Sequence, residues 1–245
     1  MTEKINESAP RSGKTVYGAV LGILMLDTRF PRIHGDIGNA GTWPFPVIYK
    51  IVGGATSDKV VRKGASGLRD NFTRAAKETV AMGAEGIGTT CGFLSLFQDD
   101  IAQAAGVPVA SSSLMQVPWV QSTLPPHQRV GVITISKESI TPAHLKAVGV
   151  PLDTPIVGTE EGKTFTTTVL DDGEYMDFEL ARDDLVAAGQ RLVTEYPNIG
   201  AVVLECTNMG PFTRDIQLNL GLPVFDVVSY LTWFQAGLQP RRYQP

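Results

Sequence analysis

Apolar, β-branched segments alternate along this chain with longer segments of helical periodicity, a pattern typical of α/β proteins. In the first part of the chain the pattern predicts strands at 17–24, 46–52, 85–90 and 107–110, and helices at 67–82 and 95–105. In the second part it predicts strands at 129–134, 199–204 and 222–225, and helices at 184–196 and 212–220. The apolar segment 227–238 is expected to form a last helix that packs on the first part.

The two parts also share sequence at their centres. A shift of 115 residues aligns seven identical residues within nineteen positions, namely Cys91 with Cys206, Phe97 with Phe212, Asp100 with Asp215, Ile101 with Ile216, Gly106 with Gly221, Pro108 with Pro223 and Val109 with Val224. Chance identity at one position is roughly one in fifteen, so the repeat indicates a duplication. We therefore predict two pseudo-symmetric α/β halves with mainly parallel sheets and right-handed crossovers, and an active site in the cleft between them.

This repeat sets the expected organisation of the chain. The first half is predicted to comprise residues 15–113 together with 227–245, and the second half residues 114–226. Residues 1–14 are polar and are expected to form a disordered lead-in.

Composition narrows the classes of function. The chain has 245 residues, 43% of them hydrophobic, which is ample for a core, and its net charge of -4 gives no basic footprint for nucleic acid. It contains neither an apolar run of the ~20 residues that span a bilayer nor the apolar region of a secretory signal. Two cysteines in such a chain favour free thiols. We expect a cytoplasmic protein, a homo-oligomer, that binds neither nucleic acid nor membrane.

The two cysteines are the main candidates for chemistry. A single buried cysteine is usually only a small hydrophobic residue. Here, however, Cys91 and Cys206 each follow an apolar strand and precede a helix, where backbone N–H groups and the helix dipole favour a thiolate. Two thiols at equivalent positions would face each other across one cleft, and they suit proton transfer to and from carbon.

Polar residues near the cysteines are candidates for binding a substrate carboxylate or carbonyl. Thr90 and Gly92 flank Cys91, Thr207 and Asn208 follow Cys206, and Thr134 ends the predicted strand 129–134. The same residues can also serve as ordinary helix caps. Glu205 directly precedes Cys206, and because neighbours on a strand point to opposite faces, we expect it to face a helix or another subunit.

The segment 27–43 has no helix or strand period and is therefore expected to be functional. Asp27, Thr28 and Arg29 at its start are candidate substrate-binding residues, and Arg29 or Arg32 either clamps a substrate carboxylate or forms an ordinary surface ion pair. His34 is either an acid/base group or an ordinary loop histidine.

The motifs Thr89-Thr-Cys-Gly92 and Glu205-Cys-Thr-Asn208, each after an apolar strand, resemble those of the aspartate/glutamate/hydantoin racemase superfamily. The resemblance runs from about Tyr17 to the C-terminus. It implies two similar α/β halves, one catalytic cysteine from each half, and no cofactor or metal. Asn208 stands where amino-acid racemases of this superfamily have a histidine.

The leading hypothesis is an isomerase, namely a cofactor-independent racemase or epimerase of a small carboxylate or carbonyl compound such as an amino acid or a hydantoin. The two cysteines would serve as its two bases. The alternatives within the superfamily are a maleate-type cis-trans isomerase and an arylmalonate-type decarboxylase, although the decarboxylase type lacks the first cysteine. A two-lobed binding protein ranks last, because binding alone gives no reason for paired thiols. Dinucleotide, serine-elbow and zinc motifs are all missing from the sequence.

Overall fold

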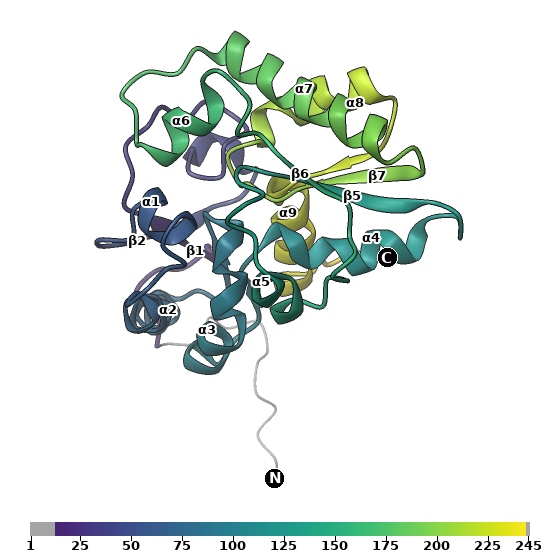
Figure 1. The fold of residues 1–245 in the computed structure, drawn as a ribbon. Helices are drawn as coiled ribbons and strands as arrows, with labels where there is room; N and C mark the ends of the chain where they lie inside the picture. Colours follow the sequence, from purple (N-terminus) through teal and green to yellow (C-terminus); the bar gives the residue numbers. More distant parts are fainter. Residues whose placement is uncertain (1–12, 244–245) are drawn as a thin grey trace.

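Two four-stranded parallel sheets form the frame of the molecule (Figure 1). The computed structural model describes residues 13–243, so the predicted disordered lead-in, residues 1–14, lies outside the described residues except for its last two. The first sheet has the order β2-β1-β3-β4, with bounds β1 Leu21–Leu26, β2 Val47–Val52, β3 Gly86–Thr89 and β4 Val109–Ala110. The second has the order β6-β5-β7-β8, with bounds β5 Arg129–Thr134, β6 Ile156–Gly158, β7 Ile199–Leu204 and β8 Val224–Phe225.

Helices connect the strands and cover the sheets. In the first half they are η1 Ala40–Thr42, α1 Ser57–Val61, α2 Arg69–Met82, η2 Gly92–Phe97 and α3 Gln98–Ala105. The second half and its connections contain η3 Ser113–Met115, α4 Gln116–Thr123, α5 Pro142–Ala147, α6 Phe165–Leu170, α7 Phe178–Glu195, η4 Gly210–Phe212, α8 Thr213–Leu220 and α9 Val227–Leu238. The predicted α/β fold with two parallel-sheet halves is confirmed.

The duplication is visible in matching local structure. In each half a central strand, β3 or β7, leads into a short 3-10 turn and then an eight-residue helix. Both helices end at a left-handed glycine, Gly106 with φ of 66° and Gly221 with φ of 65°. Because glycine adopts this conformation without strain, the same residue ends the same helix in both halves.

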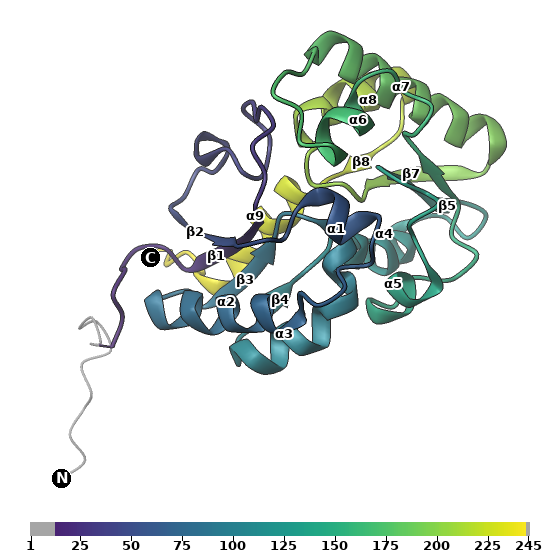
Figure 2. The ribbon, with the colours of Figure 1, turned by 60° about the vertical axis from the view of Figure 1, so that its left-hand side comes forward.

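Helix α9 returns from the second half to the first (Figure 2). Its first turn is capped by Asp226, whose carboxylate accepts a hydrogen bond from the Ser229 N–H at 2.7 Å. The helix packs on β3, where Gly86 and Gly88 leave room for the side chains of Leu238 and Leu231. The glycines of a strand thus permit close approach of the covering helix.

Several predicted boundaries shift for local reasons. The first strand begins at Leu21 and not at residue 17, because Gly18 with φ of +85° interrupts the extended run. Helix α2 begins after Gly67, whose φ of +71° lies outside the helical region. Helix α7 begins earlier than predicted because Asp177 caps it, accepting from the Glu179 and Leu180 N–H groups at 3.0 and 3.1 Å.

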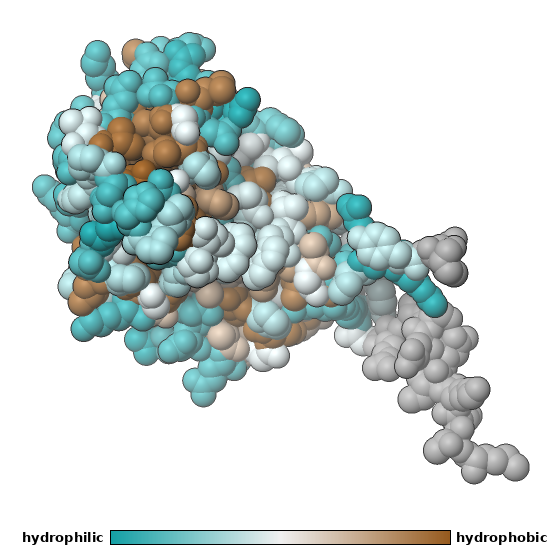
Figure 3. Space-filling view, turned by 90° about the vertical axis from the view of Figure 1, so that its right-hand side faces the viewer, coloured by the Kyte–Doolittle hydropathy of each residue, from teal (hydrophilic) through white to brown (hydrophobic). Residues whose placement is uncertain are grey.

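The surface accords with the mixed composition. Hydrophilic side chains cover most of the face in Figure 3, and hydrophobic ones gather in a few patches. Within residues 13–243 no helix is both long and apolar enough to cross a bilayer.

Candidate active site

Both cysteines line one cavity between the two halves, at the carboxyl ends of β3 and β7. Cys91 and Cys206 are free thiols, 8% and 7% exposed. Four other predicted site residues line the same cavity, namely Thr90, Gly92, Thr207 and Asn208. The structure therefore brings together the residues at the centre of each sequence motif.

The surroundings of the two sulfurs favour the neutral thiol. The backbone N–H groups of Phe93 and Asn208 each lower the pKa of the neighbouring thiol. Burial is the larger cause and raises both thiol pKa values well above the usual range, and the nearby charge of Glu205 raises them further. The expectation that the helix N-terminus yields a thiolate is thus wrong, because burial outweighs the backbone N–H groups. The Cys206 thiol also donates to Asn208 Oδ1 at 3.6 Å.

Glu205 forms part of the cavity wall, and its expected orientation away from the site is wrong. Strand β7 ends at Leu204, so the alternation of side chains no longer applies at residues 205 and 206. Glu205 is fully buried, and its Oε2 accepts a hydrogen bond from the Thr134 hydroxyl at 2.8 Å. Burial raises its pKa to about 7, although the bonds from Thr134 and the Ile135 N–H oppose this.

Gly92 allows this arrangement. A Cβ atom at residue 92 would overlap Oε1 and the carbonyl oxygen of Glu205. The turn after β3 therefore approaches the end of β7 as closely as only glycine permits. The first half and the second half meet here through one carboxylate and one glycine.

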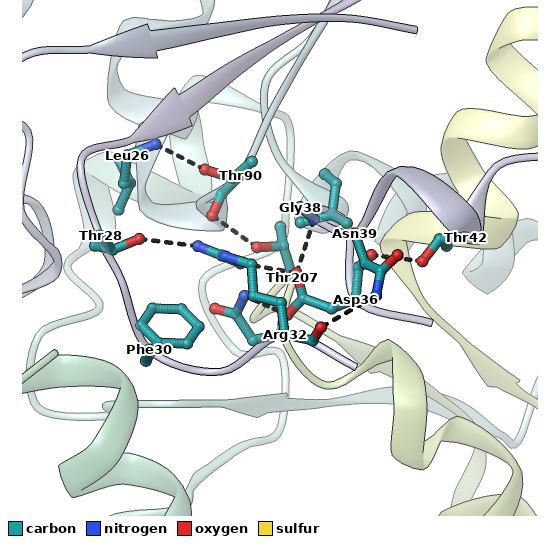
Figure 4. Close-up of polar contacts among 12 residues, drawn as sticks. Leu26, Thr28, Phe30, Arg32, Asp36, Gly38, Asn39, Thr42, Thr90 and Thr207 are labelled. Atoms are coloured by element: carbon teal, nitrogen blue, oxygen red, sulfur yellow. Dashed lines mark hydrogen bonds and ion pairs between the residues drawn. The ribbon is translucent and has the colours of Figure 1, made fainter. Parts of the chain in front are cut away.

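Hydrogen bonds join the turns that follow β3 and β7 (Figure 4). The Thr207 hydroxyl donates to the Thr90 carbonyl oxygen at 2.7 Å, and the Thr90 hydroxyl accepts from the Leu26 N–H at 2.9 Å. Asn208 Nδ2 donates to Asp36 Oδ2 at 2.8 Å. The residues beside both thiols are therefore fixed to each other and to the loop after β1.

The loop after β1 is braced by its own side chains and rises toward the second half (Figures 2 and 4). Arg32 forms a largely buried ion pair with Asp36 at 2.7 Å and donates to the Thr28 hydroxyl at 2.9 Å. Its guanidinium also lies 4.2 Å from the centroid of the Phe30 ring. With these partners Arg32 is engaged within the loop, and it is not among the residues that line the cavity. Sequence analysis missed Asp36, because the i,i+4 spacing from Arg32 indicates a contact only on a helix and this segment has no helical period.

The remaining predicted residues do not line the cavity. Asp27 accepts a hydrogen bond from the Gly54 N–H at 3.3 Å, and the Arg29 side chain is exposed. The Thr28 hydroxyl accepts a hydrogen bond from Arg32. The Thr134 hydroxyl donates to Glu205, which itself lines the cavity. His34 is exposed and its Nε2 lies 2.8 Å from the Gly41 carbonyl oxygen, as in an ordinary loop.

Two short helices that the sequence did not predict complete the cavity. Ser57 and Val61 come from α1 of the first half, and Val169 and Leu170 from α6 of the second. An ion pair between Arg62 and Asp171 at 2.6 Å joins these helices at the surface. Thr56, which caps α1 through a bond from the Lys59 N–H, was the one sequence signal for this helix.

The cavity is narrow, and the side chains that line it are buried. Its volume is about 20 Å³, which is room for about one water molecule. A substrate of several non-hydrogen atoms can therefore enter only when lining segments separate. In the cavity wall, α1 of the first half contacts α6 of the second half, and both are short helices.

A wider groove of about 270 Å³ lies elsewhere, between α4 and α9. Its lining is mostly aromatic and includes Trp119, Phe225, Tyr230 and Trp233. It holds neither cysteine nor carboxylate, so the chemistry belongs to the smaller cavity despite the difference in volume. Within the described residues, no group of three or more His, Cys, Asp or Glu side chains is placed to hold a metal ion.

Comparison with known sequences reveals relatives that are named as lyases. No protein-family model matches the chain. The chain is 27% identical over 239 residues to a dimethylsulfoniopropionate lyase of Durusdinium sp. clade D, covering 93% of this chain and 78% of the relative. It is 30% identical over 230 residues to dimethylsulfoniopropionate lyase 7 of Emiliania huxleyi, covering 89% of this chain and 67% of the relative.

Solved structures with the same fold include an arylmalonate decarboxylase and an aspartate racemase. A variant of arylmalonate decarboxylase superimposes with a TM-score of 0.61 at 15% identity, covering 92% of this chain and 96% of that chain. The aspartate racemase of Picrophilus torridus gives a TM-score of 0.55 at 13% identity, covering 93% and 96%. At such identities the likeness concerns the fold alone, which is the fold that the resemblance of the cysteine motifs implied.

The relatives correct the predicted reaction. The sequence was interpreted as a racemase or epimerase, hence an isomerase, whereas its curated relatives are named as lyases. The physical reason is that two thiols on equivalent strand ends provide for proton transfer at a carbon atom. The pair therefore predicts which groups transfer the proton. It does not predict the reaction, because several reactions begin with the removal of a proton from carbon.

Proposed function

The chain belongs to the family of the dimethylsulfoniopropionate lyases, within the aspartate/glutamate racemase superfamily, and from this premise we propose that it is a lyase that cleaves 3-(dimethylsulfonio)propionate. The observation that carries the proposal is the shared cavity. Two thiols and a buried carboxylate line one closed space between the halves. These groups suit removal of a proton from a small charged carbon acid.

The proposed reaction is a β-elimination. A base removes a proton from the carbon next to the substrate carboxylate, and the electron pair of that C–H bond becomes the new C=C bond. The bond between the β carbon and sulfur breaks, and its electron pair stays on sulfur. The products are acrylate, neutral dimethyl sulfide and one proton, so the reaction needs neither an oxidant nor a cofactor.

We assign the base to one of the two thiols. Both thiols are buried, and each has a backbone N–H beside it, from Phe93 or from Asn208, that stabilises a thiolate. Elimination returns no proton to carbon, because dimethyl sulfide leaves without one. A single base therefore suffices, and the second thiol has a lesser part in the reaction.

The test is product formation by the purified protein. Dimethyl sulfide is measured in the headspace by gas chromatography and acrylate by NMR, and we expect the two in equal amounts. Cys91→Ser and Cys206→Ser serve as matched variants, because the two residues occupy equivalent positions. One of them is expected to lose on the order of 10²–10⁴-fold in turnover, and the other much less.

Two results would contradict the proposal. The first is the absence of dimethyl sulfide from the wild-type protein at millimolar substrate. The second is full turnover in both variants, which would remove the thiols from the reaction. Thermal unfolding of each variant establishes that a loss of turnover is not a loss of fold.

A further inference from the structure

The Oε1 oxygen of Glu205 is a buried acceptor in the cavity wall. The residue is fully buried, and within the described residues Oε1 has no hydrogen-bond partner. No Lys or Arg of residues 13–243 pairs with this carboxylate, and no cation contributes to its raised pKa. Leaving a buried carboxylate oxygen unpaired is costly, so the position calls for a partner that the chain itself does not supply.

The rest of the cavity wall indicates what kind of partner fits. Apolar side chains make up much of the lining, namely Leu26, Val61, Phe93, Ile135, Val169 and Leu170. An ammonium group with N–H bonds would leave donors unsatisfied among such side chains. A sulfonium or quaternary ammonium group carries its charge among methyl groups and has no N–H. It therefore suits a bare carboxylate oxygen in an apolar wall.

We infer that Glu205 binds the cationic group of the substrate and so selects an onium carboxylate over a neutral carboxylate of the same shape. This inference rests on the proposed function, because it assigns the sulfonium end of the proposed substrate to Glu205. It also places the carboxylate end of the substrate away from Glu205, since two carboxylates would repel each other.

Binding of a cation at Glu205 would also act on the thiols. The charge of Glu205 raises the pKa of both Cys91 and Cys206, and a neighbouring positive charge offsets that effect. Asp36 also raises the pKa of Cys206, but its own charge is paired with Arg32. The substrate's sulfonium would thus favour formation of the thiolate that removes its proton.

The test uses two unreactive ligands of the same shape. In 3-(trimethylammonio)propionate a quaternary nitrogen bears three methyl groups, and in 4,4-dimethylpentanoate a neutral carbon bears them. Isothermal titration calorimetry with the wild-type protein is expected to show tighter binding of the ammonio ligand by about tenfold or more. Glu205→Gln, which keeps the size and removes the charge, is expected to bind the two ligands within about twofold of each other.

Glu205→Asp is the matched control, because it keeps the charge on a shorter side chain. It is expected to retain the preference for the cationic ligand, even if both ligands bind more weakly. An unchanged preference in Glu205→Gln would overturn the inference. So would equal affinity of the wild-type protein for the two ligands.

These measurements separate the inference from the proposed function. If the wild-type protein releases dimethyl sulfide and Glu205→Gln still prefers the cationic ligand to the neutral one, the lyase proposal is supported and the proposed role of Glu205 is wrong. If the charge preference depends on Glu205 and no dimethyl sulfide is formed, the cation site stands and the substrate is another onium carboxylate.

Discussion

Thr90 and Glu205 occupy equivalent positions in the two halves, since the shift of 115 residues that relates the cysteines also carries Thr90 onto Glu205. Each side chain bonds the last residue of the neighbouring strand in its own sheet, β1 for Thr90 and β5 for Glu205. The Thr90 hydroxyl accepts from the Leu26 N–H, and the Glu205 carboxylate accepts from the Thr134 hydroxyl. One of the pair is neutral and the other is ionisable, so the duplicated frame encloses a site with two electrostatically different ends.

This asymmetry bears on the reaction. A racemase treats two mirror-image faces of one carbon alike, and a symmetric pair of bases serves that purpose. An elimination substrate has a carboxylate at one end and a cationic leaving group at the other. The hydroxyl of Thr90 and the carboxylate of Glu205 at equivalent positions therefore accord better with an elimination substrate, whose two ends differ in charge.

The raised pKa of Glu205 predicts a pH dependence of stability. Its pKa rises from an ordinary 4.5 to about 7 in the folded protein. Between these values the folded protein holds the proton and the unfolded chain has released it, so stability falls as pH rises. The contribution is fully present below pH 4.5 and lost above pH 7, and its size is about 3 kcal/mol. Glu205→Gln does not titrate and lacks this loss.

The measurement is urea unfolding of the wild-type protein and Glu205→Gln from pH 4.5 to 8. The free energy of unfolding of the wild-type protein should fall relative to that of the variant across this window. Glu174→Gln, which removes an exposed carboxylate, is the control and should follow the wild-type profile. Parallel profiles for the wild-type protein and Glu205→Gln would show that burial does not perturb this carboxyl group.

Periodicity predicted most of the frame. The bounds of β5, β7 and α9 agree with the predicted ones, because each is a continuous apolar run or a long amphipathic segment with clear ends. The short helices α1 and α6 were missed, since five or six residues complete too few turns to show a helical period.

The candidate site was predicted in part. The internal repeat identified both thiols and the four neighbouring residues that line the cavity. The orientation of Glu205 was misjudged because the rule of alternating faces was applied one residue beyond the end of β7. Asp27, Thr28 and Arg29 were chosen for their place at a strand end. In the structure, however, Asp27 bonds the Gly54 N–H, Thr28 bonds Arg32, and Arg29 is exposed at the surface. Such loop geometry depends on tertiary contacts that local sequence does not show.

Gly92→Ala tests the close approach between the halves. The added methyl group would overlap Glu205, so either the carboxylate or the turn after β3 must move. We expect a loss of about 1–3 kcal/mol in stability, as for other overpacked cores, together with a loss of lyase activity. Thermal unfolding and the dimethyl sulfide assay measure the two effects.

Gly237→Ala is the matched control for this substitution. Gly237 is exposed in α9, and among the described residues its new methyl group would meet no atom within 4 Å apart from the backbone of its own helix and its chain neighbours. Replacing glycine by alanine in a helix stabilises by up to about 1 kcal/mol, so this variant should be at least as stable as the wild-type protein. Wild-type stability in Gly92→Ala would contradict the tight contact.

The ion pair between Arg62 and Asp171 is expected to hold the cavity closed. It joins α1 of the first half to α6 of the second, and both helices line the cavity. Both side chains are about half exposed, so the pair contributes only about 0.2–1 kcal/mol. Arg62→Ala should therefore change overall stability little, but it should raise the population of open molecules by up to about fivefold.

Alkylation of the buried thiols measures this opening directly. Iodoacetamide is larger than the closed cavity of about 20 Å³, so Cys91 and Cys206 react only through open molecules. We expect Arg62→Ala to speed alkylation, followed by mass spectrometry, about two- to fivefold, and high salt to bring the wild-type rate toward that of the variant. Lys63→Ala is the control, because the ion pair of Lys63 is with Asp58 of the same half. Equal acceleration by both substitutions would mean that opening occurs elsewhere, since of these two residues it is Arg62 that pairs with Asp171 of the second half.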